Sequence, residues 1–257
     1  VAPDVTVSAT ELDYGDCFLR YPYKKVIELV NHSDLPAKFE LQIQDEISQC
    51  VAVYEVDYQK GTIEAFSTRI ITVSFTTLRL DKVQLPMFFT IIGHEDEPLE
   101  IQCIANGVGP KLTLTPPAIK WGDIEVLKDF EKTLKVKNDS LVPADFQTLI
   151  LKRNSRFKVT MPSASLAPGE TANLKVIANI DDTQAFKDEL CLIVTEGGEI
   201  KVPLTAKGTG TTITCKDYEL GSQPDVHLGH QFTSRASRKF FTITNRGPKA
   251  QTLTWYN

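Results

Sequence analysis

The feature that most constrains this chain is an internal repeat about one domain in length. The anchors are a glycine and an asparagine that each recur at one constant spacing: Gly15, Gly122 and Gly229, and Asn31, Asn138 and Asn245. Two independent anchors with the same spacing, found three times, indicate tandem copies of a single unit. Because a spacing of roughly 100 residues is the size of a domain, each copy is expected to bury a core of its own.

The repeat divides the 257 residues into two full copies and part of a third. Matching glycines at Gly109 and Gly210 close the first two copies and predict domains at 1–109 and 110–210. Residues 211–257 hold only the opening strands of a third copy, which alone would leave unpaired strand edges. We therefore expect the chain to be a fragment of a longer array, with short junctions that keep neighbouring domains close.

Each copy has the pattern of short β-strands. In the run 25–30, Ile27 and Leu29 alternate with residues of the opposite face, as in a half-buried strand. Turn signals recur every 8–12 residues or so, and the expected secondary structure includes no long helix and at most one helical turn at 181–188. About seven strands per copy predict an all-β protein of tandem immunoglobulin-like β-sandwiches, although the Cys…Trp…Cys triplet of antibody domains is missing.

Composition excludes several classes of protein. A hydrophobic fraction of 42%, a charged fraction of 24% and a mean hydropathy of -0.15 are those of an ordinary globular protein. Apolar runs such as 86–92 are too short to cross a bilayer, so no membrane insertion is expected. A net charge of -5 lacks the basic footprint of nucleic-acid binding. Five scattered cysteines favour a reducing compartment with free thiols.

Residues suited to catalysis are scarce. No nucleophile elbow, zinc-protease or phosphate-loop motif occurs, and the pairs Gly107/Gly109 and Gly208/Gly210 are interpreted as flexible backbone at domain junctions. His227 and His230 would point to opposite faces of a strand, and the acidic pair at 181–182 is interpreted as a solvated loop end. We predict no enzyme, and no catalytic, cofactor-binding or metal-binding residue.

Two glycosylation sequons begin at Asn31 and Asn138, but both coincide with the repeated turn asparagine, so the turn explains them. One basic cluster remains as a candidate site: Lys152, Arg153, Arg156 and Lys158. Such a cluster is either a solvated face or a docking patch for an acidic partner surface.

The repeated order of aromatic-Gly, an alternating strand ending in Asn, and a Pro/Ala-Phe strand resembles the ASH domain, a relative of the major sperm protein fold. The stretches 178–183, 207–213 and 240–247 are similar to a family of very long ASH arrays in motile cilia. This resemblance implies a non-enzymatic component of the central apparatus, in the cytoskeleton of the ciliary axoneme, required for beating. It also implies central-pair proteins as partners, with tubulin or microtubules as further candidates, and no cofactor.

Three functions stay open at this point. The first is the scaffold segment of the central apparatus. The second is a peptide-recognition adaptor in ciliary or membrane trafficking, in which a sandwich edge accepts an extended peptide beside the basic cluster. The third is an extracellular adhesion array, which would require disulfides.

Overall fold

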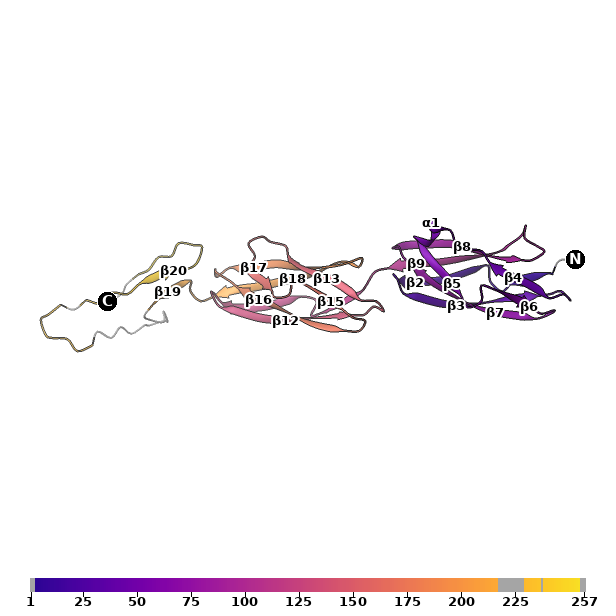
Figure 1. The fold of residues 1–257 in the computed structure, drawn as a ribbon. Helices are drawn as coiled ribbons and strands as arrows, with labels where there is room; N and C mark the ends of the chain where they lie inside the picture. The colour runs from indigo at the N-terminus through magenta and orange to yellow at the C-terminus, as the bar shows by residue number, and fades with distance from the viewer. Residues whose placement is uncertain (1–2, 217–228, 237, 255–257) are drawn as a thin grey trace.

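The computed structural model describes residues 3–216, 229–236 and 238–254, and they form two complete β-sandwiches followed by a short third unit (Figure 1). The sandwiches lie end to end along the chain. Each has its own hydrophobic core, so the expected all-β, immunoglobulin-like class is confirmed.

The first sandwich packs a four-stranded sheet against a five-stranded sheet. The four-stranded sheet has the order β1 (Val5–Val7), β3 (Pro22–Asn31), β7 (Thr68–Thr77) and β5 (Ala52–Val56). The five-stranded sheet has the order β2 (Glu11–Phe18), β9 (Leu99–Val108), β8 (Asp81–Ile91), β4 (Ala37–Leu41) and β6 (Lys60–Ile63). All neighbours are antiparallel except β2 and β9, which run parallel.

The second sandwich repeats this topology strand for strand. Its four-stranded sheet has the order β10 (Leu112–Thr115), β12 (Asp129–Asn138), β16 (Thr171–Asn179) and β14 (Phe157–Val159). Its five-stranded sheet has the order β11 (Ile119–Glu125), β18 (Gly198–Thr209), β17 (Ala185–Val194), β13 (Ala144–Ile150) and β15 (Ser163–Leu166). The parallel pair is again the first long strand with the last, β11 with β18.

In the third unit, β19 (Ile213–Cys215) pairs antiparallel with β20 (Ile243–Asn245). This pair is equivalent to β1 with β3, in which Val5 also lies opposite the repeated asparagine. Leu253 follows Asn245 by eight residues, as Phe39 and Phe146 follow Asn31 and Asn138, so the repeat predicts a buried anchor of the next strand at this position. Leu253 is 51% exposed, whereas Phe39 and Phe146 are buried, so this prediction is wrong, and the residues described for this unit supply only one pair of strands.

The cores confirm the alternation read from the sequence. Ile27 and Leu29 of β3 are fully buried, as are Leu134 and Val136 at the matching places in β12. Cys17, Cys103 and Cys191 are buried as small apolar side chains, whereas Cys50 is exposed.

The helical turn lies elsewhere than expected. In the segment 181–188, residues 182–184 form a bend and residues 185–188 begin β17, and the helix described is α1 (Glu46–Gln49), in the loop between β4 and β5. Asp45 caps α1, because its side chain accepts a hydrogen bond from the Ser48 amide. No described helix is long and apolar enough to span a bilayer.

Candidate functional site

The basic cluster lies at one edge of the second sandwich. Lys152 and Arg153 are exposed in the turn between β13 and β14, and Lys158 is exposed on β14 itself. β14 is the outermost strand of its sheet and pairs with β16 on one side. Its other side presents backbone donors and acceptors, which is the feature that an added strand requires.

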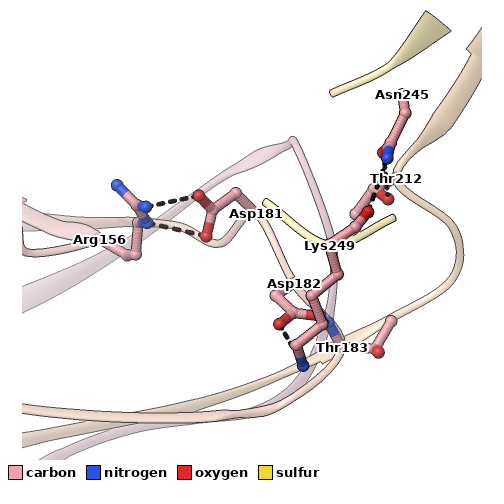
Figure 2. Close-up of polar contacts among 7 residues, drawn as sticks. All are labelled: Arg156, Asp181, Asp182, Thr183, Thr212, Asn245 and Lys249. Atoms are coloured by element: carbon pink, nitrogen blue, oxygen red, sulfur yellow. Dashed lines mark hydrogen bonds and ion pairs between the residues drawn. The ribbon is translucent and has the colours of Figure 1, made fainter. Parts of the chain in front are cut away.

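Only part of the cluster is free to meet a partner. The Arg156 guanidinium forms a two-pronged contact with the Asp181 carboxylate, with Nε–Oδ1 at 2.8 Å and Nη2–Oδ2 at 2.6 Å (Figure 2). The Lys152 ammonium donates to the backbone carbonyl of Lys187. Within the described parts of the chain, Arg153 and Lys158 have neither an ion pair nor a side-chain hydrogen bond. Arg153 and Lys158 therefore carry uncompensated charge, as does Lys152, whose carbonyl partner is neutral.

Beside Arg156, the end of the second sandwich is tied to the third unit (Figure 2). Asp182 accepts a hydrogen bond from the Thr183 amide at 2.7 Å and pairs with the Lys249 ammonium at 2.6 Å. Its side chain is 5% exposed, so the expectation of a solvated loop end is wrong for Asp182. The contact with Lys249 lowers the pKa of this carboxyl group from its ordinary value.

A second ion pair joins the first two sandwiches. The Arg20 guanidinium donates two hydrogen bonds to the Glu196 carboxylate, at 2.7 and 2.8 Å, across 176 residues of sequence. This pairing lowers the pKa of Glu196. A hollow of about 340 Å³ adjoins it, lined by Leu19, Arg20, Pro110, Val142, Pro143, Asp145, Thr195 and Glu196.

Gly107, Gly109 and Gly208 are packed tightly, which corrects their interpretation as flexible backbone, whereas a Cβ on Gly210 would make only an ordinary contact, 3.6 Å from Glu125. A Cβ on Gly109 would lie 1.7 Å from the Glu196 carbonyl oxygen. A Cβ on Gly107 or Gly208 would lie 2.0 Å from the carbonyl oxygen of Arg79 or Asp182, respectively. These three positions require glycine because a side chain would collide with the backbone of another segment, and the Gly109 contact also limits movement at the first junction.

The other candidate chemistry finds no support in the described residues. His230 is exposed, and His227 lies outside the described part of the chain. No group of three or more His, Cys, Asp or Glu side chains placed to hold a metal ion occurs within the described ranges. The sequon residues Asn31 and Asn138 are buried and use their amide groups to close turns, which confirms the turn interpretation.

Sequence reasoning missed four residues that join the units: Arg20, Glu196, Asp182 and Lys249. Their partners are far away in sequence, so no local motif marks them. The repeat carried a usable signal, because Val142 and Lys249 each follow the turn asparagine of their own copy by four residues. That alignment places both residues at the same end of their units.

The fold and these sites define a class: a tandem array of PapD-like, immunoglobulin-like domains that act as structural or adaptor modules and not as enzymes. The chain belongs to the flagellar-associated PapD-like family, whose model matches residues 2–102 and 109–209. This membership places it among cilium- and flagellum-associated proteins.

The particular relatives agree with the resemblance seen in the sequence. The chain is 31% identical to the human hydrocephalus-inducing protein homolog over 258 residues, covering all of this chain and 5% of that protein. It is 24% identical to cilia- and flagella-associated protein 65 of Chlamydomonas reinhardtii, over 68% of this chain and 8% of the relative. The chain thus spans a small part of the length of these relatives.

Among solved structures, the ASH/PapD-like domain of human CEP192 aligns with 39% of this chain and 87% of its own length. That alignment has a TM-score of 0.37 and 9% sequence identity.

Proposed function

We propose that this chain is a segment of a non-enzymatic scaffold in the central apparatus of motile cilia and flagella, located in the axoneme. The observation that carries the proposal is the serial arrangement of closely joined sandwiches in a chain related to the hydrocephalus-inducing protein. An ion pair at each junction and the close packing of Gly109 against the Glu196 carbonyl link successive units, so the segment is suited to spanning a distance and presenting repeated edges. Central-pair proteins, and tubulin as a further candidate, are the partners that follow from this role.

Co-sedimentation with isolated axonemes tests the scaffold. The 257-residue chain is mixed with salt-extracted axonemes, and its pelleted fraction is measured over a range of salt concentrations. We expect saturable pelleting that decreases with salt, because exposed charges are screened within about 8 Å at physiological ionic strength. Pelleting no greater than that of an unrelated β-sandwich of similar charge would contradict the proposal.

A second function, peptide recognition, is favoured by the basic edge strand. β14 presents open backbone groups beside Arg153 and Lys158, which suits an extended acidic peptide. An adaptor of this kind could also operate within a scaffold.

A peptide array separates this function from the scaffold alone. Acidic peptides that bind the whole chain should lose affinity with Arg153→Glu and with Lys158→Glu. The matched control is Lys175→Glu, which reverses an exposed charge of the same sheet that is already paired with Glu131. Equal losses in all three variants would indicate nonspecific attraction and would contradict recognition at β14.

A further inference from the structure

The two junctions of this chain are held by charge pairs of opposite polarity. At the first junction the leading sandwich supplies the cation, Arg20, and the following sandwich supplies the anion, Glu196. At the second junction the leading sandwich supplies the anion, Asp182, and the following unit supplies the cation, Lys249. The sign of the contributing group is therefore reversed from one junction to the next.

The two pairing residues lie at the same end of their sandwiches, at different positions. Gly107 and Gly208 pack in the same way against the carbonyls of Arg79 and Asp182, so these two residues hold matching positions at the ends of their sandwiches. Arg20 and Leu127 also match, since each follows the anchor glycine of its copy by five residues and both have a positive φ, 59° and 62°. The end of the first sandwich thus has Arg20 and Arg79 at the positions where the second sandwich has Leu127 and Asp182, respectively.

The end of each following unit that faces the preceding sandwich, here called its receiving end, carries the opposite sign of charge. Val142 and Lys249 occupy matching positions, because the carbonyl of each accepts a hydrogen bond from the side-chain amide of its turn asparagine. Around Val142, the second sandwich presents Asp145 and Glu196 to the arginine end of the first. The third unit presents Lys249 itself to the aspartate end of the second (Figure 2).

We propose that the sign of charge at each sandwich end is a pairing code that selects which PapD-like domain docks next. The arginine end of the first sandwich accepts a domain whose receiving end is acidic, and the aspartate end of the second accepts a domain whose receiving loop is basic. A mismatched domain would bring like charges together at the contact, which is how natural interfaces reject wrong partners. Because the order of the domains is set by the chain itself, the code favours docking between consecutive domains and disfavours docking between identical ends.

Burial makes the second junction the more selective of the two. Arg20 and Glu196 are 61% and 35% exposed, so their pair changes the ratio of docked to undocked forms by roughly two- to five-fold. At the second junction the Lys249 side chain is 59% exposed but the Asp182 side chain is only 5% exposed, and a buried carboxylate without its cation is far less favourable than an exposed one. Reversal of Lys249 should therefore have a larger effect than reversal of Arg20.

Charge reversal in the 257-residue chain tests the first junction. Residual dipolar couplings report whether the two sandwiches align as one body. Arg20→Glu and Glu196→Arg should each make the two alignments diverge, and the double variant should restore a common alignment. Glu125→Arg, which breaks a pair with Lys128 inside the second sandwich, is the matched control and should change nothing. The proposal would be overturned if the two sandwiches of the single variants share one alignment, as in the parent chain. It would also be overturned if their alignments diverge as much in the double variant as in the single variants.

The second junction is tested by Lys249→Glu, Asp182→Lys and their combination. Backbone relaxation of residues 211–216 and 242–250 should show faster local motion in each single variant and recovery in the double variant. Trp121, which donates to the Phe130 carbonyl inside the second core, reports that the sandwich itself stays folded. Equal motion in all three variants would overturn the proposal. The proposal goes beyond the ciliary scaffold, because a failure of axonemal co-sedimentation would leave these results unchanged.

Discussion

At the scale of the residue, the repeated asparagine closes the same turn in all three copies. Its side-chain amide donates to the carbonyl four residues later, and its Oδ1 accepts from the amide two residues later: Leu35 and Ser33, Val142 and Ser140, Lys249 and Gly247. In the two complete sandwiches the amide reaches two further carbonyls, which binds the turn to the neighbouring strand. The asparagine thus has the same role in each copy: its side chain forms hydrogen bonds with the backbone groups of the turn.

Asn138→Ala should destabilise the second sandwich by about 3 kcal/mol, because it leaves the buried carbonyl of Leu166 and the partly buried hydrogen bonds to the Val142 and Ala167 carbonyls without their donor. Urea unfolding followed by Trp121 fluorescence, in a Trp255→Phe background, measures the change. Asn173→Ala, at an exposed position of β16, is the control and should change the free energy of unfolding by no more than about 0.5 kcal/mol. A similar small shift for Asn138→Ala would show that the turn closes without its side chain.

At the scale of the element, the long strands that end each sandwich depend on close backbone contact. β9 and β18 lie between a parallel and an antiparallel neighbour, and each carries a glycine where the backbone of a loop crosses it. Pro203 lies within β18 but just before its pairing with β11 begins at Leu204, so its missing amide hydrogen removes no bond to β11. Whether a proline, or a residue larger than glycine, is tolerated in β18 therefore depends on its position along the strand.

Gly208→Ala should destabilise the second sandwich by about 3 kcal/mol, because its Cβ would lie 2.0 Å from the Asp182 carbonyl oxygen. Gly169→Ala is the matched control in the same sandwich. It has open space around it and a φ of 76°, so it should cost only about 1 kcal/mol. Thermal unfolding followed by Trp121 fluorescence compares the two, and equal losses would contradict the close-packing explanation.

At the scale of the whole molecule, the units are independent in their cores and connected by polar contacts. Each complete sandwich buries its own apolar cluster, and the residues that cross the junctions are mainly charged or backbone groups. Interfaces of this composition respond to salt and pH more than a hydrophobic core does. The geometry between units is therefore the property that solution conditions should change first.

Acid should release the third unit from the second sandwich. The pKa of Asp182 is lowered in the folded chain, chiefly by Lys249, so the contact contributes fully above the ordinary value of 3.8 and is lost as pH falls through the folded pKa. The amide shift of Thr183, which donates to Asp182, should therefore change below pH 3.8. Lys249→Gln should move this step to higher pH, and Asp182→Asn should abolish it. A step unaffected by Lys249→Gln would assign the titration to another group.

The sequence by itself determined the repeat, the all-β class, the alternating core and the turn asparagines. These depend on local backbone geometry and on the two-residue period of a strand, which are readable along the chain. It misplaced the helical turn, because four residues capped by Asp45 leave no periodic apolar pattern.

Only the tertiary structure decided which charges matter. Arg156 forms an ion pair with Asp181, the buried Asp182 with Lys249, and Arg20 with Glu196. Each of these outcomes joins groups from separate strands or separate units, and pairings of that kind have no signature in local sequence. The physical reason is that burial and charge pairing are properties of a surface in three dimensions, whereas composition and spacing describe the chain in one.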